Sequence, residues 1–144
     1  MKRIMAIILA LLMTISLIFV TSAEEEEPPV QGEDIEEYVN TKRAETLLSI
    51  NSSGTATIII ECVGLSGTTH ISSVTYLEKR IGSSWSRVSF NGMSQIEDGV
   101  SASILSKTYT TTVGSGQYRA TAIFTVTRNG TDETVTVYSN IVYH

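Results

Sequence analysis

The sequence predicts an all-β domain, an antiparallel β-sandwich of about seven strands. From Thr41 onward the chain is rich in threonine, serine, valine and isoleucine, and both prolines precede that point. Short segments alternate polar and apolar residues with period 2, as half-buried strands do. Turn signals recur every ~8–12 residues, which is typical of a sandwich. A closed barrel is the alternative that this pattern leaves open.

The first 23 residues have the form of a signal peptide. Lys2 and Arg3 begin the chain, an apolar run fills positions 4–20, and Thr21 and Ala23 supply the small residues of a cleavage site. The run is about as long as the ~17-residue lower limit for a spanning helix, so an uncleaved membrane anchor is the alternative. Because "EEEEPP" follows at once, we favour cleavage and expect a secreted, extracellular protein.

Residues 24–40 form an acidic leader. Eight of the 15 acidic residues lie between Glu24 and Glu37, and from Tyr38 onward the chain has seven acidic and eight basic residues. A segment so charged and so poor in large apolar groups is typical of a solvated, disordered leader. The domain at 41–144 therefore lacks the basic stripe that nucleic-acid binding needs, and we expect no nucleic-acid partner.

Cys62 is the single cysteine, so an internal disulfide is excluded. A reactive thiol needs nearby positive charge, and the adjacent Ile60, Glu61 and Val63 supply none. We therefore expect a small buried hydrophobe at this position.

The expected elements follow in chain order. A first segment at 44–50 is a strand or a short helix, and the turn "NSSG" at 51–54 leads into a strand over 55–63. That strand places Ala56, Ile58, Ile60 and Cys62 on one face. The segments 70–80 and 84–90 form a hairpin, 91–103 is a longer connection, and 104–113 is a further strand. Glycines 114 and 116 make a corner before the strand at 117–127.

Asn129-Gly130 is the clearest turn signal. This dipeptide between alternating segments favours a type I′ hairpin, because both central positions need positive φ. A two-residue loop sets Arg128 opposite Thr131, and then Phe124 opposite Val135, Ala122 opposite Val137 and Tyr118 opposite Ile141. The apolar residues then share one face.

The segment "SGQYRA" resembles the tyrosine-corner motif of immunoglobulin-like domains. Tyr118 matches the motif's tyrosine, Ala120 stands at the position of the second cysteine, and Cys62 matches the first. The resemblance spans 44–143 and implies an immunoglobulin-like sandwich without a disulfide, in which the Tyr118 hydroxyl bonds a backbone group of the glycine corner. In antibody-type domains a tryptophan lies on the strand that packs against the disulfide, whereas Trp85 here follows a hairpin.

The chain also resembles short exported proteins of Gram-positive bacteria that form a family of unknown function. The likeness rests on the signal peptide, the acidic leader, "LEKRIGSSW" and the terminal "YRATAIFTV" and "TVYSN". It implies a fold and a compartment but no activity.

Catalytic and metal-binding patterns are absent from the sequence. His70 and His144 are the two histidines, and no GxSxG elbow accompanies any serine. Apart from the C-terminal His144, one histidine, one cysteine and scattered carboxylates remain. These do not predict a metal site, and we expect no cofactor. Glu97 and Asp98 in the "IEDG" loop favour an ordinary polar turn over a calcium site. The chain is therefore not expected to be an enzyme.

Aromatic residues are the one positive indication of function. Large aromatics are usually mostly buried, and this makes core packing the commoner role for Tyr76, Trp85, Tyr109 and Tyr138. Several on an exposed sheet face would instead stack on a sugar ring or a partner peptide; Tyr76, Trp85 and Tyr138 are the candidates. We expect a secreted, non-enzymatic module that binds an extracellular protein or a cell-surface glycan. The alternative is a small extracellular hydrolase or a carbohydrate-binding accessory domain.

Overall fold

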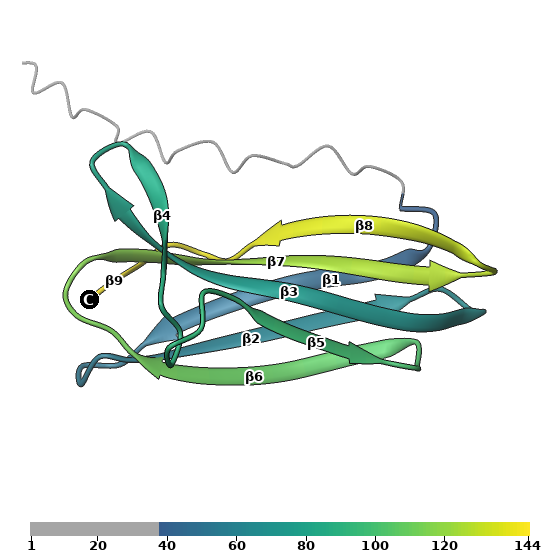
Figure 1. Ribbon diagram of the computed structural model, residues 1–144, viewed down its shortest axis with the longest axis horizontal. Helices are drawn as coiled ribbons and strands as arrows, with labels where there is room; N and C mark the ends of the chain where they lie inside the picture. Colours follow the sequence, from purple (N-terminus) through teal and green to yellow (C-terminus); the bar gives the residue numbers. More distant parts are fainter. Residues whose placement is uncertain (1–37) are drawn as a thin grey trace, which may run out of the picture. The chain divides into compact units, whose positions relative to one another are not determined.

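The computed structural model describes residues 38–144, which form two antiparallel β-sheets packed as a sandwich (Figure 1). The predicted signal peptide and residues 24–37 of the predicted leader lie outside the described residues. No helix within residues 38–144 is long and apolar enough to span a membrane. The strands are β1 (Thr41–Ile50), β2 (Thr55–Gly64), β3 (Thr68–Ile81), β4 (Ser84–Val88), β5 (Ile96–Val100), β6 (Ile104–Thr112), β7 (Gln117–Arg128), β8 (Thr131–Tyr138) and β9 (Val142–Tyr143).

The two sheets differ in size. The smaller has the order β1-β2-β6, and the larger has the order β4-β3-β7-β8, with β5 also paired to β3 and β9 also paired to β7. Because the strands divide into two sheets, the sandwich prediction is confirmed over the closed barrel. Figure 1 shows the β3–β4 hairpin projecting from the body of the sandwich.

The core lies between the sheets and follows the predicted alternation. Ala56, Ile58, Ile60 and Cys62 of β2 are all fully buried, as are Ala120, Ala122, Phe124 and Val126 of β7. Complete burial of a side chain the size of isoleucine or phenylalanine stabilises a fold by ~1.5–3 kcal/mol. Cys62 is a free, buried thiol, so this apolar packing holds the sheets together without a disulfide.

The first element is a strand and not the short helix that the sequence left open. Pairing sets Leu48 opposite Ile58 and Thr46 opposite Ile60, which directs alternate β1 side chains inward. The far edge of β1 is also bonded: the Asn140 side-chain amide donates to the Leu48 carbonyl (3.1 Å) and accepts from the Leu48 N–H (3.2 Å). Contacts distant in sequence therefore select the extended conformation.

Glu133 of β8 holds the start of β1. Its carboxylate accepts hydrogen bonds from the Val39 N–H (2.5 Å), the Asn40 N–H (3.0 Å) and the Thr41 hydroxyl (2.7 Å). Burial opposes ionisation of this carboxyl, but the hydrogen bonds from residues 39–41 outweigh it and lower its pKa. Val39 and Asn40, which the sequence assigns to the end of the leader, thus bond to the sandwich.

The Asn129-Gly130 turn is confirmed. Both residues have positive φ, 52° and 76°, as a type I′ turn requires. Arg128 pairs with Thr131, Phe124 with Val135 and Ala122 with Val137, in the predicted register.

The prediction for Tyr118 was wrong by one residue, because it pairs with Val142 and not with Ile141. The register changes beside Ser139, whose hydroxyl accepts from the Ala120 N–H (2.8 Å) and donates to the Asn140 carbonyl (2.7 Å). A side-chain oxygen thus replaces a backbone carbonyl in the ladder, and the chain accommodates one extra residue before β9.

The prediction of a plain connection over 91–103 was also wrong. This stretch contains β5, which pairs with Ile71–Thr75 of β3 and, with the short β9, raises the strand count from about seven to nine. A turn at Asn91-Gly92, with φ of 51° and 89°, bridges Phe90 to Met93. The predicted "IEDG" loop is therefore strand, and Glu97 and Asp98 point to opposite faces.

Candidate functional site

Three of the four aromatic residues singled out in the sequence lie on the solvent face of the larger sheet. Tyr76 of β3 and Tyr138 of β8 both pair with Thr121 of β7, which places them in one row across three strands. Trp85 of β4 pairs with Arg80, which lies four residues after Tyr76 on β3 and therefore on the same face. Tyr138 is half-exposed, and Tyr76 and Trp85 are partly exposed.

Arginine side chains cover these rings. The Arg119 guanidinium lies 4.6 Å from the Trp85 ring centre and 4.7 Å from that of Tyr138, so that it contacts both. Such cation–π contacts contribute ~0.5–1 kcal/mol each at exposed sites. Arg119 is the bridge between aromatics that lie on different strands.

Glu78 fixes the position of Arg119. Its carboxylate accepts from Arg119 Nε at 2.8 Å and from the Thr121 hydroxyl at 2.8 Å. The Glu78 side chain is only 14% exposed, so water screens this pair less than it would a fully exposed one. Glu78 therefore holds Arg119 in place on this face.

Arg87 of β4 differs from Arg119. Its guanidinium lies 3.5 Å from the Tyr76 ring centre, and the residue is exposed. Within residues 38–144 its one recorded interaction is this ring contact, and no carboxylate lies within ion-pair distance of it. Its N–H groups remain available to an acceptor. We call Tyr76, Glu78, Trp85, Arg87, Arg119 and Tyr138 together the arginine–aromatic face.

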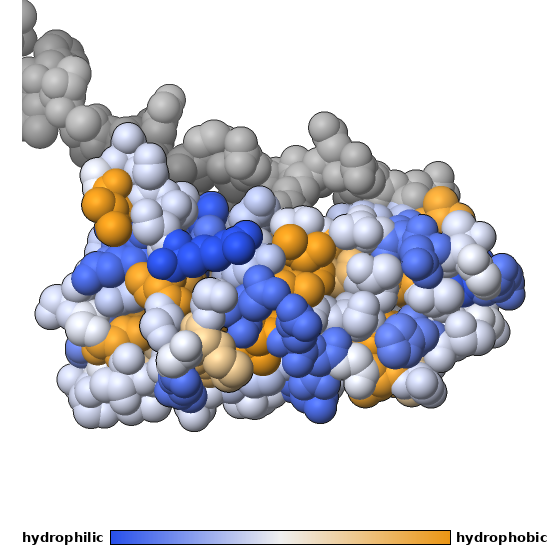
Figure 2. Space-filling model, in the orientation of Figure 1, coloured by the Kyte–Doolittle hydropathy of each residue, from blue (hydrophilic) through white to orange (hydrophobic). Residues whose placement is uncertain are grey.

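Positive charge gathers at this end of the sheet. Arg80 lies two residues after Glu78 on the same face of β3, and Arg87 and Arg119 lie opposite Glu78 on the neighbouring strands. Figure 2 shows strongly hydrophilic residues next to apolar ones where the β3–β4 hairpin leaves the body of the domain. On this face one carboxylate, that of Glu78, thus lies among three cations.

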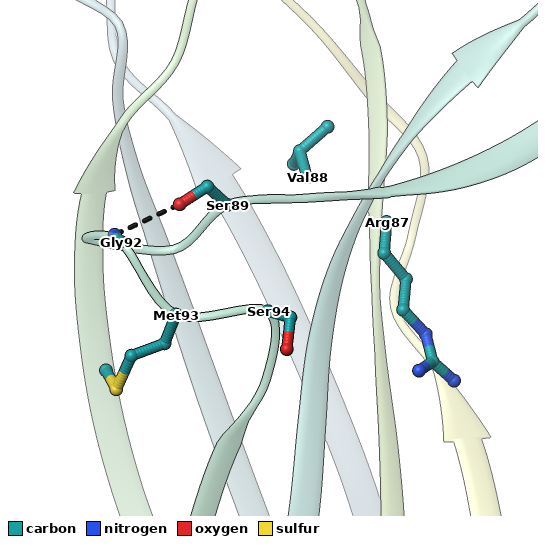
Figure 3. Close-up of a pocket in the computed structure, with 6 residues that line it drawn as sticks. All are labelled: Arg87, Val88, Ser89, Gly92, Met93 and Ser94. Carbon is teal, nitrogen blue, oxygen red and sulfur yellow. Dashed lines mark hydrogen bonds between the residues drawn. The ribbon is translucent and has the colours of Figure 1, made fainter.

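A small pocket of about 200 Å³ adjoins the face (Figure 3). Arg87, Val88 and Ser89 at the end of β4 form one side, and the segment 92–94 of the following turn forms the other. The Ser89 hydroxyl accepts from the Gly92 N–H at 3.0 Å and closes the base of this turn. Met93 is 51% exposed, and together with Val88 it supplies the apolar part of the pocket lining.

Tyr109, the fourth aromatic, lies inside the sandwich. Its ring packs edge-to-face on Phe90 at 6.3 Å, and its hydroxyl donates to Asp98 at 3.2 Å. Asp98 also pairs with Lys107 at 3.2 Å. Burial opposes ionisation of Asp98, but the bonds from Lys107, the Gly99 N–H and Tyr109 lower its pKa. This group joins β5 to β6 and is structural.

The predicted structural residues are placed as follows. Tyr118 is buried, and its hydroxyl donates to the Gly114 carbonyl at 2.9 Å, the bond expected of a tyrosine corner. Burial of Cys62 raises the pKa of its thiol to about 12, so at neutral pH the reactive thiolate is scarce. Asn129 and Gly130 form the β7–β8 turn.

His70 and the acidic residues are the groups from which a catalytic or metal site would have to be built. His70 is exposed beside Gly99, and among residues 38–144 no hydrogen bond or ion pair of its side chain to a serine or carboxylate is recorded. In the same part of the chain, no group of three or more histidine, cysteine, aspartate or glutamate residues is arranged to hold a metal ion.

Comparison of the chain with protein-family models, curated proteins and solved structures found no match.

The sequence reasoning missed Glu78, Arg87 and Arg119, although a signal for them was present. Tyr76 with Glu78, and Trp85 with Arg87, are separated by two positions, so each pair shares one face of its strand. Once β7 is placed between β3 and β8, Arg119 falls beside all of them. What the sequence could not supply was the order of the strands.

Proposed function

We propose that this protein is an exported, non-enzymatic binding module that engages an extracellular protein through its arginine–aromatic face. The observation that carries the proposal is Arg119, held by Glu78 between Trp85 and Tyr138. Aromatic and arginine residues dominate the energetics of protein interfaces, and a pre-assembled cluster loses little side-chain entropy on binding. Export and a Gram-positive source remain part of the proposal, on the N-terminal segment and the sequence resemblance.

An immunoglobulin-like identity is part of the same proposal. The orders β1-β2-β6 and β4-β3-β7-β8 follow the immunoglobulin arrangement if the strands are named A-B-E and C′-C-F-G. In this assignment Cys62 lies on strand B and Tyr118 near the start of strand F. Such domains present sheet faces and loops to partners, and this supports a binding role by analogy with the fold.

A protein partner is favoured over a glycan because guanidinium groups already occupy ring faces. Stacking on a sugar needs a free aromatic face, whereas Arg119 contacts both Trp85 and Tyr138, and Arg87 covers Tyr76. Exposed guanidinium edges instead suit carboxylates on a protein surface.

Binding of the labelled mature chain to intact cells of the producing strain, measured by flow cytometry, tests the proposal. We expect protease treatment of the cells to abolish binding and periodate oxidation of glycans to leave it. Arg119→Ala and Tyr138→Ala should each weaken binding at least tenfold. Leu47→Ser, on the solvent face of the smaller sheet, is the matched control and should bind normally.

Circular dichroism and thermal unfolding of each variant separate lost binding from lost folding. Binding that is sensitive to periodate but not to protease would replace the protein partner with a glycan. Equal loss in the Leu47→Ser variant, or full binding by both face variants, would contradict the proposal.

A further inference from the structure

The outer edge of β4 presents unpaired backbone groups. Gly82 and Ser83 form a two-residue loop, so the flanking pair Ile81 and Ser84 is the closely spaced, hydrogen-bonded pair of the hairpin. Hydrogen bonding alternates along an antiparallel pair, so Ser84, Ser86 and Val88 bond to β3. The N–H and C=O groups of Trp85 and Arg87 therefore point away from the sheet, and no partner for them is recorded within residues 38–144.

Two other sheet edges in the described chain are blocked. The Asn140 side chain bonds both backbone groups of Leu48 on β1. On β6, Asn91 donates to the Thr110 carbonyl (3.0 Å), and Lys107 points inward to Asp98 (3.2 Å). Proteins use such devices to prevent pairing with foreign strands, and no side chain within residues 38–144 makes a comparable contact to the outer edge of β4.

The surroundings of the β4 edge select the side chains of an added strand. On one face Arg87 offers a guanidinium without an acidic partner in the described part of the chain. At the end of the edge, Val88 and Met93 are the apolar residues that line the adjoining pocket. Because side chains alternate along a strand, the matching segment alternates acidic and apolar residues.

We infer that β4 accepts an extended segment of a partner protein as an added strand, with a carboxylate of that segment on Arg87 and a neighbouring apolar side chain in the pocket formed by 87–89 and 92–94. The inference rests on the proposed function and names the recognition mode of its partner. In strand addition, main-chain hydrogen bonds supply affinity and side-chain pockets supply specificity. A second copy of the chain is a poorer occupant, because antiparallel β4 edges would bring two Arg87 guanidinium groups together.

The test uses the ¹⁵N-labelled mature chain and an acetylated, amidated six-residue peptide in which glutamate and valine alternate. We expect binding in the micromolar to low millimolar range. The Trp85 and Arg87 amide signals should shift most, and exchange of these two amide hydrogens with solvent should slow at least fivefold. Arg87→Ala should weaken binding at least fivefold and Met93→Ser at least twofold, whereas Arg43→Ala on the smaller sheet should leave it unchanged.

Two control peptides separate strand addition from simple charge attraction. A peptide that alternates lysine and valine should not bind. Alternate backbone nitrogens of the glutamate–valine peptide can be N-methylated in two frames, and both keep the charge of the peptide. Binding should be lost in the frame that blocks the N–H groups facing β4. Equal binding by both methylated frames, shifts that map away from β4, or no binding at 5 mM would each overturn the inference.

Failure of this inference is distinguishable from failure of the proposed function. Loss of cell binding in the Arg119→Ala variant combined with no peptide binding would leave the face as the interface and remove strand addition. Dimerisation of the mature chain that Arg87→Ala abolishes would assign the edge to a second copy and would also overturn the inference.

Discussion

Glu133 offers the sharpest test of how the domain is held together. Its two carboxylate oxygens accept three hydrogen bonds from the residues at which the chain enters β1. In Glu133→Gln one oxygen becomes an NH₂ group that faces donors, so at least one bond is lost and one repulsive contact is introduced. The rest of the side chain keeps its shape.

The expected magnitude follows from the number and exposure of these bonds. A buried hydrogen bond to a charged group contributes ~1.5–3 kcal/mol, and partial exposure reduces this to about 1 kcal/mol for each bond. We therefore expect Glu133→Gln to lower the free energy of unfolding by about 2–3 kcal/mol at pH 7. At ~4–8 °C for each kcal/mol, the melting temperature should fall by roughly 10–20 °C.

The effect should depend on pH in one direction. The pKa of Glu133 is lowered in the folded state, so its contribution is complete above the unfolded pKa, near ~4.3, and is lost as pH falls through the folded pKa. Urea unfolding of the parent and the variant at pH 7 and at pH 2.5 measures this. The difference between them should be large at pH 7 and should shrink at pH 2.5.

Asp132→Asn is the matched control, because Asp132 is the adjacent carboxylate and accepts a single exposed bond from Thr127 (2.6 Å). It should change the free energy of unfolding by no more than ~0.5 kcal/mol. Equal stability of the parent and Glu133→Gln at pH 7, or a difference that persists unchanged at pH 2.5, would refute the reasoning.

Three further predictions concern the core and the contact between β5 and β6. Tyr118→Phe should lower the free energy of unfolding by about 1 kcal/mol through loss of its hydroxyl bond, with the exposed Tyr143→Phe as a near-neutral control; equal effects would contradict the tyrosine-corner role. Cys62→Ala should also cost about 1 kcal/mol, since only one buried sulfur is removed, and reductant should not change unfolding of the parent; a shift with reductant would reveal a thiol partner. Asp98→Asn should destabilise the domain at pH 7 but not at pH 2.5, because the lowered pKa of Asp98 makes its contribution to stability disappear as pH falls. A loss of equal size at both pH values would exclude the ion pair with Lys107 as the cause.

The fold class and the last hairpin could be predicted from the sequence because their signals are local. Asn129 and Gly130 tolerate positive φ whatever surrounds them, and a two-residue loop then dictates which residues of β7 and β8 lie opposite each other. The alternation at Ala56, Ile58 and Ile60 likewise needs only the geometry of one strand to direct these side chains inward.

The same dipeptide at Asn91-Gly92 also forms a turn with positive φ, but the strand that follows it cannot be predicted from the sequence. No clear alternation follows that turn, because β5 contains Glu97, Asp98 and a glycine, which have low strand propensity. Its strand conformation comes from pairing with β3 and from the bonds of Asp98 to Lys107 and Tyr109. A strand that is stabilised mainly by its partners therefore shows little of the alternation or residue preference that predicts a strand.

By itself the sequence indicated Tyr76, Trp85 and Tyr138 as candidates for an exposed binding surface, but tertiary structure alone decided which side chains surround them. Arg119 is 34 positions from Trp85 and 41 from Glu78, and these residues meet because β3 pairs with β4 on one side and β7 on the other. Residues on one strand constrain each other through a fixed backbone geometry, whereas strand order follows from the packing of the whole core. Local pattern therefore determines the strands, and only the folded chain determines which side chains they bring together.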